Sequence, residues 1–487
     1  MRVKLFLLTL MGSLISLSLG ASETRQPLSE TDLIYKILEK NINVQVAQTN
    51  RELGHLNLTA TRARFDTLLE FDTSHTIDKR DRTSTIFGTT NKITQFDLGF
   101  SRLFPTGTET SLKFVNQREA TDSLFATINP NFDAGVEMSL NQPLLKNMLG
   151  KQDRGEVRLA KKQIEALDYQ TQESILQETH RVLNHYWNLS VSLERQKIFK
   201  KFVDEAQHFL ETTQGRQKLG LAQDADVFAA KANLLESKKG LLTAQTHIQD
   251  WQAQLQNDLD LEKEIQLIPT KEIKPDILVP DFPEAMNQAL NKRADYKAAQ
   301  TLLEHENIKV SLKKNSRWPE LDLFSTLTLN GVDSRYTHSI QESFSGDHPN
   351  WLFGLKLTVP LENRLARSEY SQAQLEKVKA LLQVKQMENQ IRQQIDVSLR
   401  GLLLKKKHLS MSQEIASLQE KKWLSELNRY KIGKSSSDLV IRYHNDYLLA
   451  EQEYLQASLE TQLARLDFQR SSNTLFDTAL QSEKKND

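Results

Sequence analysis

Several short segments of the chain alternate between apolar and polar side chains. In residues 320–330 leucines occupy most odd positions, and in residues 351–361 six apolar side chains share one face while Lys356 lies on the other. Alternation over about ten residues is typical of a β-strand with one apolar face, and about ten tilted residues also span a membrane as a barrel strand. Weaker copies of the pattern lie within residues 66–144, where Pro105–Thr108 predicts a tight turn. The first half therefore offers two or four strands, and the second half offers two.

The environment of these strands has two interpretations. In a soluble sandwich the strands would pack on each other, but four to six strands beside so much helix make a poor core. Strands that face lipid cannot stand alone either, because open edges find no hydrogen-bond partners in hydrocarbon. Copies of the chain would then pool their strands to close a barrel, and the sequence sets the number of copies only at two or more. The polar segments 79–93 and 331–350 are predicted to be outward loops.

Two long segments without proline repeat apolar residues at steps of three and four. They cover about residues 152–214 and 365–431, and some 65 helical residues make a rod of about 100 Å. Four other predicted helices are about half as long: 29–63, 227–262, 284–315 and 439–478. Two half-length helices stacked end to end match one long rod, which predicts four parallel columns, two continuous and two broken. The polar faces fit either a solvated outside or a water-filled inside.

The same order of elements occurs twice, which indicates an internal duplication. The first repeat covers residues 22–262, with strands at about 66–144, a long helix at about 152–214, a tip turn at about 215–226 and a helix at 227–262. The second covers residues 284–478, with strands at about 320–361, a long helix at 365–431, a tip turn at 432–438 and a helix at 439–478. Residues 263–283 hold four prolines, so they form a connector in the equatorial region, with room for a short edge strand.

The two ends of the chain are predicted to lie outside these repeats. Residues 1–21 combine a basic start with an apolar stretch and small residues, the pattern of a secretory signal peptide cleaved near Ala21. A retained membrane anchor is the alternative. Residues 479–487 form a C-terminal tail. No cysteine is present, so we expect neither disulfides nor a lipid anchor on an exported chain.

The composition offers no sign of catalysis or of nucleic-acid binding. The 63 basic residues balance 63 acidic ones, which gives no reason to expect a nucleic-acid partner. The eleven histidines are scattered without metal-ligand spacing, and the chain has no glycine-rich phosphate loop and no G-x-S-x-G motif. We therefore expect no catalytic residue, no cofactor and no metal, in a protein that is not an enzyme.

Five passages in order give the chain a resemblance to a known family. They are the helix that enters a strand at 284–323 (its counterpart runs from Asn41 to Phe71), the strand-to-helix passages SLNQPLLKN and LKLTVPLENRLARSEYSQAQ, and the two helix-turn-helix tips KLGLAQDADVFAAKANLLES and YKIGKSSSDLVIRYHNDYLLAE. Together they resemble the TolC-like outer membrane efflux protein family (outer membrane factors) over nearly the whole mature length. Each motif alone is loose, and their order is what makes the resemblance specific.

The resemblance implies a mainly helical fold with a membrane β-barrel portion. In that fold a homotrimer shares its transmembrane strands in one barrel and its helices in a long coiled-coil-like tunnel through the periplasm. It also implies the outer membrane of a Gram-negative bacterium, contact with outer-membrane lipid, a periplasmic adaptor protein and an inner-membrane pump as partners. Members usually contribute four strands, so a hairpin at Pro105–Phe114 would depart from the pattern. Many relatives carry a lipidated cysteine that this chain lacks.

The family narrows at the turns between paired helices, where this chain places three acids. Asp224, Asp226 and Asp438 would form rings under threefold symmetry, and rings of carboxylates favour cations. The alternative is that Asp226 and Asp438 only stabilise the first turn of a helix, with Ser437 as its cap. The family's acidic constriction is partly matched, because Arg442 follows Asp438 by one turn and could pair with it to hold the tip shut.

The exposed tips are the predicted docking site for the adaptor. Gly220 and Leu221 stand at the first tip, and Gly433 and Lys434 at the second. Glycine at these points permits a left-handed helix end, which also explains both glycines without any partner. The leading hypothesis is a passive, water-filled exit duct of a tripartite efflux pump or a type I secretion system. The alternative is a periplasmic coiled-coil scaffold or adaptor without a pore.

Overall fold

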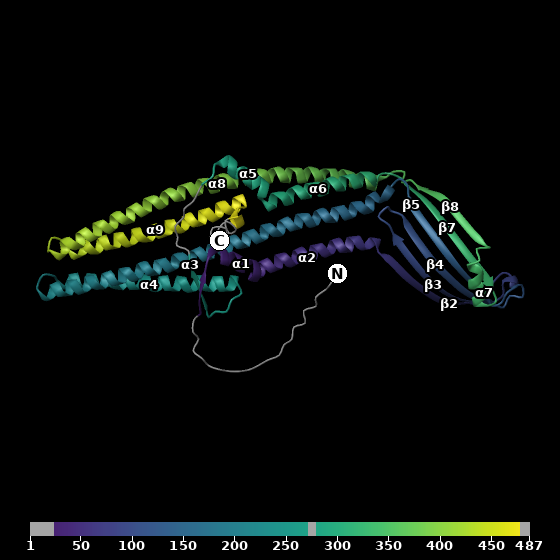
Figure 1. The fold of residues 1–487 in the computed structure, drawn as a ribbon, viewed down its shortest axis with the longest axis horizontal. Helices are drawn as coiled ribbons and strands as arrows, with labels where there is room; N and C mark the ends of the chain where they lie inside the picture. The colour runs from purple at the N-terminus through teal and green to yellow at the C-terminus, as the bar shows by residue number, and fades with distance from the viewer. Residues whose placement is uncertain (1–23, 271–278, 478–487) are drawn as a thin grey trace, which may run out of the picture.

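A computed structural model describes residues 24–270 and 279–477 of the chain. The predicted signal peptide at 1–21 and tail at 479–487 lie outside the described residues, as does the middle of the connector. Figure 1 shows a long helical rod that continues at one end into a tilted β-sheet. The expected combination of a mainly helical body with a sheet portion is therefore confirmed.

Two helices run the length of the rod, and shorter helices lie beside them in pairs. Helices α3 (Lys151–Lys218) and α8 (Arg364–Lys431) have 68 residues each, which is about 100 Å. Helices α2 (Ile42–Arg62) and α4 (Asp224–Asp258) both pack on α3. Helices α6 (Ala294–Asn315) and α9 (Ser437–Ser472) both pack on α8, and they also contact α3. The four columns inferred from helix lengths are present, with α2 and α4 in one broken column and α6 and α9 in the other (Figure 1).

The first helix of each repeat is broken, where the sequence predicted continuous helices at 29–63 and 284–315. The first divides into α1 (Glu30–Lys40) and α2 at Asn41, and the second into α5 (Phe282–Lys292) and α6 at Arg293. Both residues at the breaks have extended backbone, with ψ near 123° and 124°. The apolar periodicity continues on each side, so the pattern alone did not reveal the breaks.

The side chains of Asn41 and Arg293 stabilise these breaks. Asn41 Oδ1 accepts a hydrogen bond from the Val44 N–H as an N-cap, and its Nδ2 donates to the Asp258 carbonyl at 2.9 Å. Arg293 is buried, with one guanidinium nitrogen 2.5 Å from Asp295 and another donating to the Ser471 carbonyl at 3.1 Å. Each break therefore joins its repeat to the middle of the rod.

Six antiparallel strands form the sheet, which settles the open strand number at six. They are β2 (Thr67–Asp78), β3 (Asn91–Leu103), β4 (Glu109–Thr121), β5 (Asn131–Pro143), β7 (Glu320–Asp333) and β8 (Pro349–Thr358), hydrogen-bonded in this order. Short 3-10 helices flank them at Ala63–Phe65, Thr85–Phe87 and Met148–Gly150. The last strand ends three residues before the predicted 361, close to Pro360, which has no N–H for the ladder.

A helix occupies part of segment 331–350, which was predicted to be a loop. This helix, α7 (Tyr336–Ser343), packs on β5 and β7. Ser339 fastens it, because its hydroxyl donates to the Gly331 carbonyl at 2.6 Å and accepts from the Ala134 N–H at 2.8 Å. A Cβ at Gly331 would lie 2.4 Å from the Ser339 carbonyl oxygen, so only glycine permits this approach.

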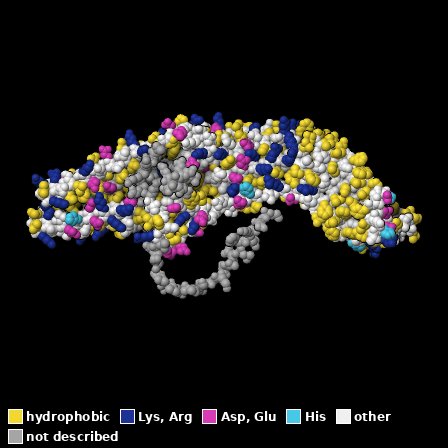
Figure 2. All heavy atoms as spheres, viewed as in Figure 1, with side chains coloured by type: hydrophobic (Ala, Val, Ile, Leu, Met, Phe, Trp, Pro, Cys, Tyr) yellow, Lys and Arg dark blue, Asp and Glu magenta, His cyan; other side chains and the backbone are white. Residues whose placement is uncertain are grey.

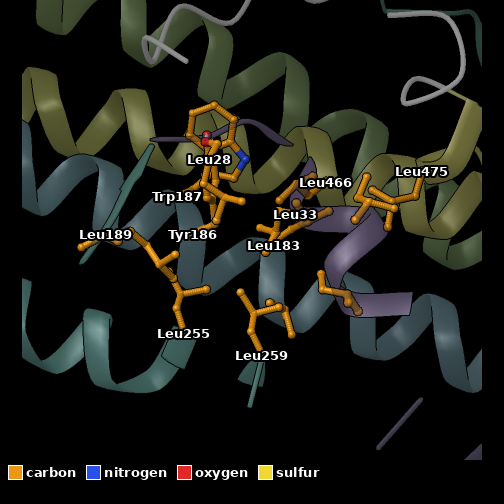
Figure 3. Packing of buried hydrophobic residues seen from close by; sticks show 14 of the residues in the cluster. Leu28, Leu33, Leu183, Tyr186, Trp187, Leu189, Leu255, Leu259, Leu466 and Leu475 are labelled. Atoms are coloured by element: carbon orange, nitrogen blue, oxygen red, sulfur yellow. Dashed lines mark hydrogen bonds between the residues drawn. The ribbon is translucent and has the colours of Figure 1, made fainter. Parts of the chain in front are cut away.

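A hydrophobic core gathers in the middle of the rod. Strands β1 (Thr24–Leu28) and β6 (Ile265–Pro269) pair there in parallel, so the connector holds a short strand. Figure 3 shows leucines from α1, α3, α4, α9 and β1 around the aromatic pair Tyr186 and Trp187, both with no exposed surface. This cluster joins both repeats at the level where the half-length helices meet.

The hydrogen bonds of Glu178 on α3 predict how the stability of the junction at Asn41 changes in acid. Its carboxylate accepts hydrogen bonds from Arg181, Asn43 and Asn41, and these hold the pKa of Glu178 at about 2. A carboxyl with a lowered folded pKa stabilises the protein above its ordinary pKa of 4.5, and this contribution disappears as the pH falls toward 2.

Replacement of Glu178 by Gln is expected to lower the urea midpoint at pH 7 and to have little effect near pH 2. The matched control is Glu194→Gln, which removes an exposed i,i+3 pair with Lys197 and should leave the midpoint unchanged at both values. Denaturation curves of the purified protein at the two pH values measure the difference. An equal loss of stability at both would contradict a role for the charged carboxylate.

Candidate functional site

One face of the sheet is apolar across all six strands. The register places Leu69, Phe100, Leu112, Met138, Leu327 and Trp351 in one continuous row, and Phe71, Leu98, Phe114, Val136, Leu329 and Pro349 in the next. Many of these side chains are exposed in the single chain, and Phe71 and Phe353 keep 66% and 71% of their surface. Figure 2 shows the resulting broad hydrophobic surface over the sheet. Such a large exposed apolar patch is typical of a surface that contacts lipid or another protein.

The opposite face of the sheet is polar and carries most of its charges. The rows between the apolar ones hold Glu70, Gly99, Lys113, Glu137, Thr328 and Asn350, then Asp72, Asp97, Val115, Gly135 and Asn330. Lys113 Nζ lies 2.8 Å from Asp97 Oδ2, the most deeply buried carboxylate of the sheet. An apolar face backed by a charged one is the pattern of a wall between lipid and water.

The two lateral sides of the chain, here called its flanks, have no neighbouring element within the described part of the chain. Strands β2 and β8 each have one neighbour in the sheet, so each leaves one edge unpaired within the chain. The rod also has two outer columns, formed by α8 on one side and by α2 and α4 on the other. Both columns expose large apolar side chains: Leu375, Leu382, Leu403, Leu404 and Leu418 on α8, and Val46, Leu53, Leu56, Phe228, Leu235 and Leu242 on α2 and α4.

The first tip is a five-residue turn between α3 and α4, shorter than the predicted 215–226. Gly220 takes the left-handed conformation with φ of 76°, and the Leu221 N–H returns to the Arg216 carbonyl at 2.8 Å. Leu221 is exposed at the end of the rod. Asp224 accepts a hydrogen bond from Gln217 Nε2 at 2.6 Å and lies in the first turn of α4. Gly220 therefore permits the left-handed end of α3, which is the role that needs no partner protein.

The second tip repeats this geometry between α8 and α9. Gly433 has φ of 80°, and the Lys434 N–H donates to the Arg429 carbonyl at 2.9 Å. Asp438 and Arg442 pair at 3.1 Å one turn apart on α9, and both side chains are largely exposed. This pair lies within one helix, so it does not join the two tips of the chain. The N-cap of α9 is Ser436, where the sequence favoured Ser437.

Asp226 joins the two tips. One carboxylate oxygen accepts a short hydrogen bond from the Ser437 hydroxyl, and the other accepts from the Gln223 N–H at 2.8 Å. These bonds hold the pKa of Asp226 below its usual range. The residue therefore caps its own helix, as one of its two predicted roles required, and also bonds to the opposite tip, which was not predicted.

Arg216 and Tyr430 form a second link that the sequence interpretation missed. The Arg216 guanidinium lies 4.6 Å from the centre of the Tyr430 ring and donates to the Tyr430 carbonyl at 2.9 Å. It thus gives a second donor to a carbonyl at the end of α8 that also accepts from the Gly433 N–H at 3.0 Å, and it places a positive charge there. Both residues stand in the repeated landmarks that end the long helices, and comparison of the landmarks was the signal that could have identified them.

Two further findings concern membranes and metals. Within residues 24–270 and 279–477 the structure contains no helix with enough length and hydropathy to cross a bilayer. In the same residues no three His, Asp or Glu side chains gather as a group that could hold a metal ion.

Comparison with known proteins gives a partial family match and a shared fold. Residues 33–259 match the model of the outer membrane efflux protein family, and no curated protein sequence matches the chain. The fold is similar to that of the outer-membrane channel OprN (TM-score 0.68, 15% identity, 91% of this chain and 89% of that one). It is also similar to CusC (0.70, 13%, 91% and 91%) and to the CmeC outer membrane channel of Campylobacter jejuni (0.66, 15%, 91% and 85%). The match across most of the first repeat and the channel fold shared over 91% of the chain both agree with the resemblance to the outer membrane efflux protein family.

Proposed function

We propose that three copies of the chain form a passive, water-filled exit duct across the outer membrane and the periplasm. The observation that carries the proposal is the two-sided sheet with two open edges, which continues into a rod with two apolar flanks. Strands closed into a barrel would place the apolar rows against lipid and the charged rows in the lumen. Helices packed flank to flank would continue the lumen as a tunnel about 100 Å long.

The rod end opposite the sheet is the proposed periplasmic end, where the duct meets its partners. A periplasmic adaptor would dock on the tips around Gly220, Leu221, Gly433 and Lys434, and an inner-membrane pump would supply the cargo. The similar structures OprN and CmeC are outer membrane channels, which supports export as the general role. We assign the duct to a tripartite efflux pump or a type I secretion system of a Gram-negative bacterium.

The tips are the proposed gate. In a closed ring, three copies of Asp224, Asp226 and Asp438 would surround the axis and favour cations at the aperture. Within each chain the bonds Asp226–Ser437 and Arg216–Tyr430 hold the two helical hairpins together, and Asp438 is kept beside Arg442. Opening requires the hairpins to separate, so the bonds Asp226–Ser437 and Arg216–Tyr430 oppose it.

The duct hypothesis predicts ion conductance by the purified protein. Incorporated into a planar bilayer, it is expected to give discrete channels, and in detergent it is expected to migrate as a trimer that dissociates on heating. A periplasmic scaffold would instead wash into the soluble fraction and give no channels. That second result, obtained with protein of native secondary structure, would reject the duct in favour of the scaffold.

Neighbouring residues on β4 predict opposite responses to a charge. Phe114→Lys places the charge on the apolar face and is expected to destabilise the membrane-inserted protein by about 2–4 kcal/mol. Val115→Lys is the matched control, because it puts the same charge on the polar face, where the lumen is proposed. Urea titration of the protein in lipid vesicles measures both. Equal destabilisation would show that the two faces do not meet lipid and water.

The link between the tips predicts an easier opening when Asp226 is replaced. Asp226→Ala removes a charge-assisted hydrogen bond worth about 1 kcal/mol at a partly exposed site, which shifts the closed-to-open ratio about fivefold. Single-channel recordings should show more frequent open events. The matched control, Asp438→Ala, removes one carboxylate of the same ring but leaves the bond between the tips intact, and it is expected to change the open fraction less. An unchanged open fraction in the Asp226 variant would argue against the gate.

A further inference from the structure

The β3–β4 hairpin departs from the four strands per chain that the resemblance implied. It lies in the middle of the sheet, with β3 bonded to β2 and β4 bonded to β5 along their lengths. Its turn is ordered by a hydrogen bond from the Phe104 N–H to the Thr108 carbonyl at 2.8 Å. Gly107 in this turn has φ of +77° and approaches the start of α3 so closely that a Cβ would lie 3.2 Å from the Asn147 carbonyl oxygen. The hairpin is therefore fixed to both the sheet and the rod.

The hairpin has the same two faces as the four other strands. Phe100 and Leu112 continue the apolar row from Leu69 to Met138, with no polar interruption. On the other face Lys113 pairs with Asp97 at 2.8 Å and lies opposite Glu137. A plug inside a water-filled lumen would not need an apolar row in register with that of the neighbouring strands. The hairpin therefore has the features of a segment of the barrel wall.

The two open edges fit each other. Strand β2 leaves the rod and β8 returns to it, so the two run in opposite directions, like every neighbouring pair in the sheet. Apolar residues occupy odd positions in both, as Leu69 and Phe71 do in β2 and Phe353 and Leu355 in β8. An even number of strands per chain is also required if identical copies are to close a fully antiparallel barrel. A second copy of the chain is therefore the partner that completes each edge.

We infer that the trimeric barrel has eighteen strands, with β2 of each copy paired to β8 of the next. This inference rests on the proposed function. Barrel diameter grows roughly linearly with strand number, so eighteen strands give a barrel about 1.5-fold wider than twelve, and barrels of 16–18 strands leave an aqueous channel. The β3–β4 hairpin is the element that sets this width, and it lets the barrel pass bulkier solutes than four strands per chain would.

Removal of the hairpin tests the inference directly. Deletion of residues 91–121 leaves segments 79–90 and 122–130 to join β2 to β5, which would then pair antiparallel in a twelve-stranded barrel. Neutral polymers of graded size, added on the sheet side of a planar bilayer, report the width of that end of the channel. The full chain is expected to admit polymers of about 1.5-fold larger radius than the deletion variant. Equal cut-offs would overturn the inference while leaving the duct intact, whereas absence of channels from the full chain would reject the proposed function itself.

Cysteine cross-links test the same inference without a deletion, because the chain has no native cysteine. Ser111 and Ser139 face each other across β4 and β5 with their hydroxyl oxygens 2.6 Å apart, so Ser111→Cys with Ser139→Cys should link within one chain of the assembled trimer. Asn350→Cys on β8, combined in turn with cysteine at Glu70, Asp72 or Ser74 on β2, should link neighbouring chains in at least one combination and give covalent trimers. A trimer that forms neither kind of link would overturn the eighteen-stranded wall. A trimer with only the link between chains would place the hairpin outside the wall, which also overturns it.

Discussion

The unpaired edges of β2 and β8 constrain the whole molecule. Backbone N–H and C=O groups at a strand edge need partners, and in hydrocarbon neither water nor side chains can replace them. The sheet also exposes apolar rows, and the exposure of so large an apolar surface to water is unfavourable. In the proposed barrel, pairing between copies would satisfy the edges, and surrounding lipid would cover the apolar rows. The exposed leucines of α8 and the α2–α4 column lie on the same flanks, so the rod and the sheet both leave surfaces on these two sides that another chain could cover.

The two ends of the molecule solve different physical problems. At the sheet, stability comes from continuous pairing, and a ladder of backbone hydrogen bonds leaves little freedom to move. At the tips, a few side-chain bonds such as Asp226–Ser437 hold two hairpins whose turns are short and exposed. Bonds of this kind contribute about 1 kcal/mol each, and the apolar cluster around Phe202 and Trp423 adds packing between the same two hairpins. The equatorial core around Tyr186 and Trp187 lies between the two ends of the molecule and joins the two repeats.

Much of this architecture follows from periodicity in the sequence. Steps of two predicted the strands, steps of three and four predicted the long helices, and helix lengths alone gave four columns. The breaks at Asn41 and Arg293 were not predicted, because helical periodicity continues through both and only their tertiary partners reveal them. Helix α7 was missed because it is short and polar. The tip links escaped as well, since Asp226 and Ser437 are 211 positions apart and meet only when the two repeats pack side by side.

The duplication explains how a closed ring can be built from so few different contacts. Each chain presents two similar helical hairpins, so in the proposed trimer six such units would surround the axis. The sheet breaks this near-symmetry, because the first repeat contributes four strands and the second only two. An extra hairpin in one repeat adds an even number of strands and therefore keeps the edges antiparallel. In the proposed duct, a whole hairpin gained or lost in one repeat would change the barrel width while the helical tunnel keeps its columns, so pore width and gate geometry would be set by different parts of the chain.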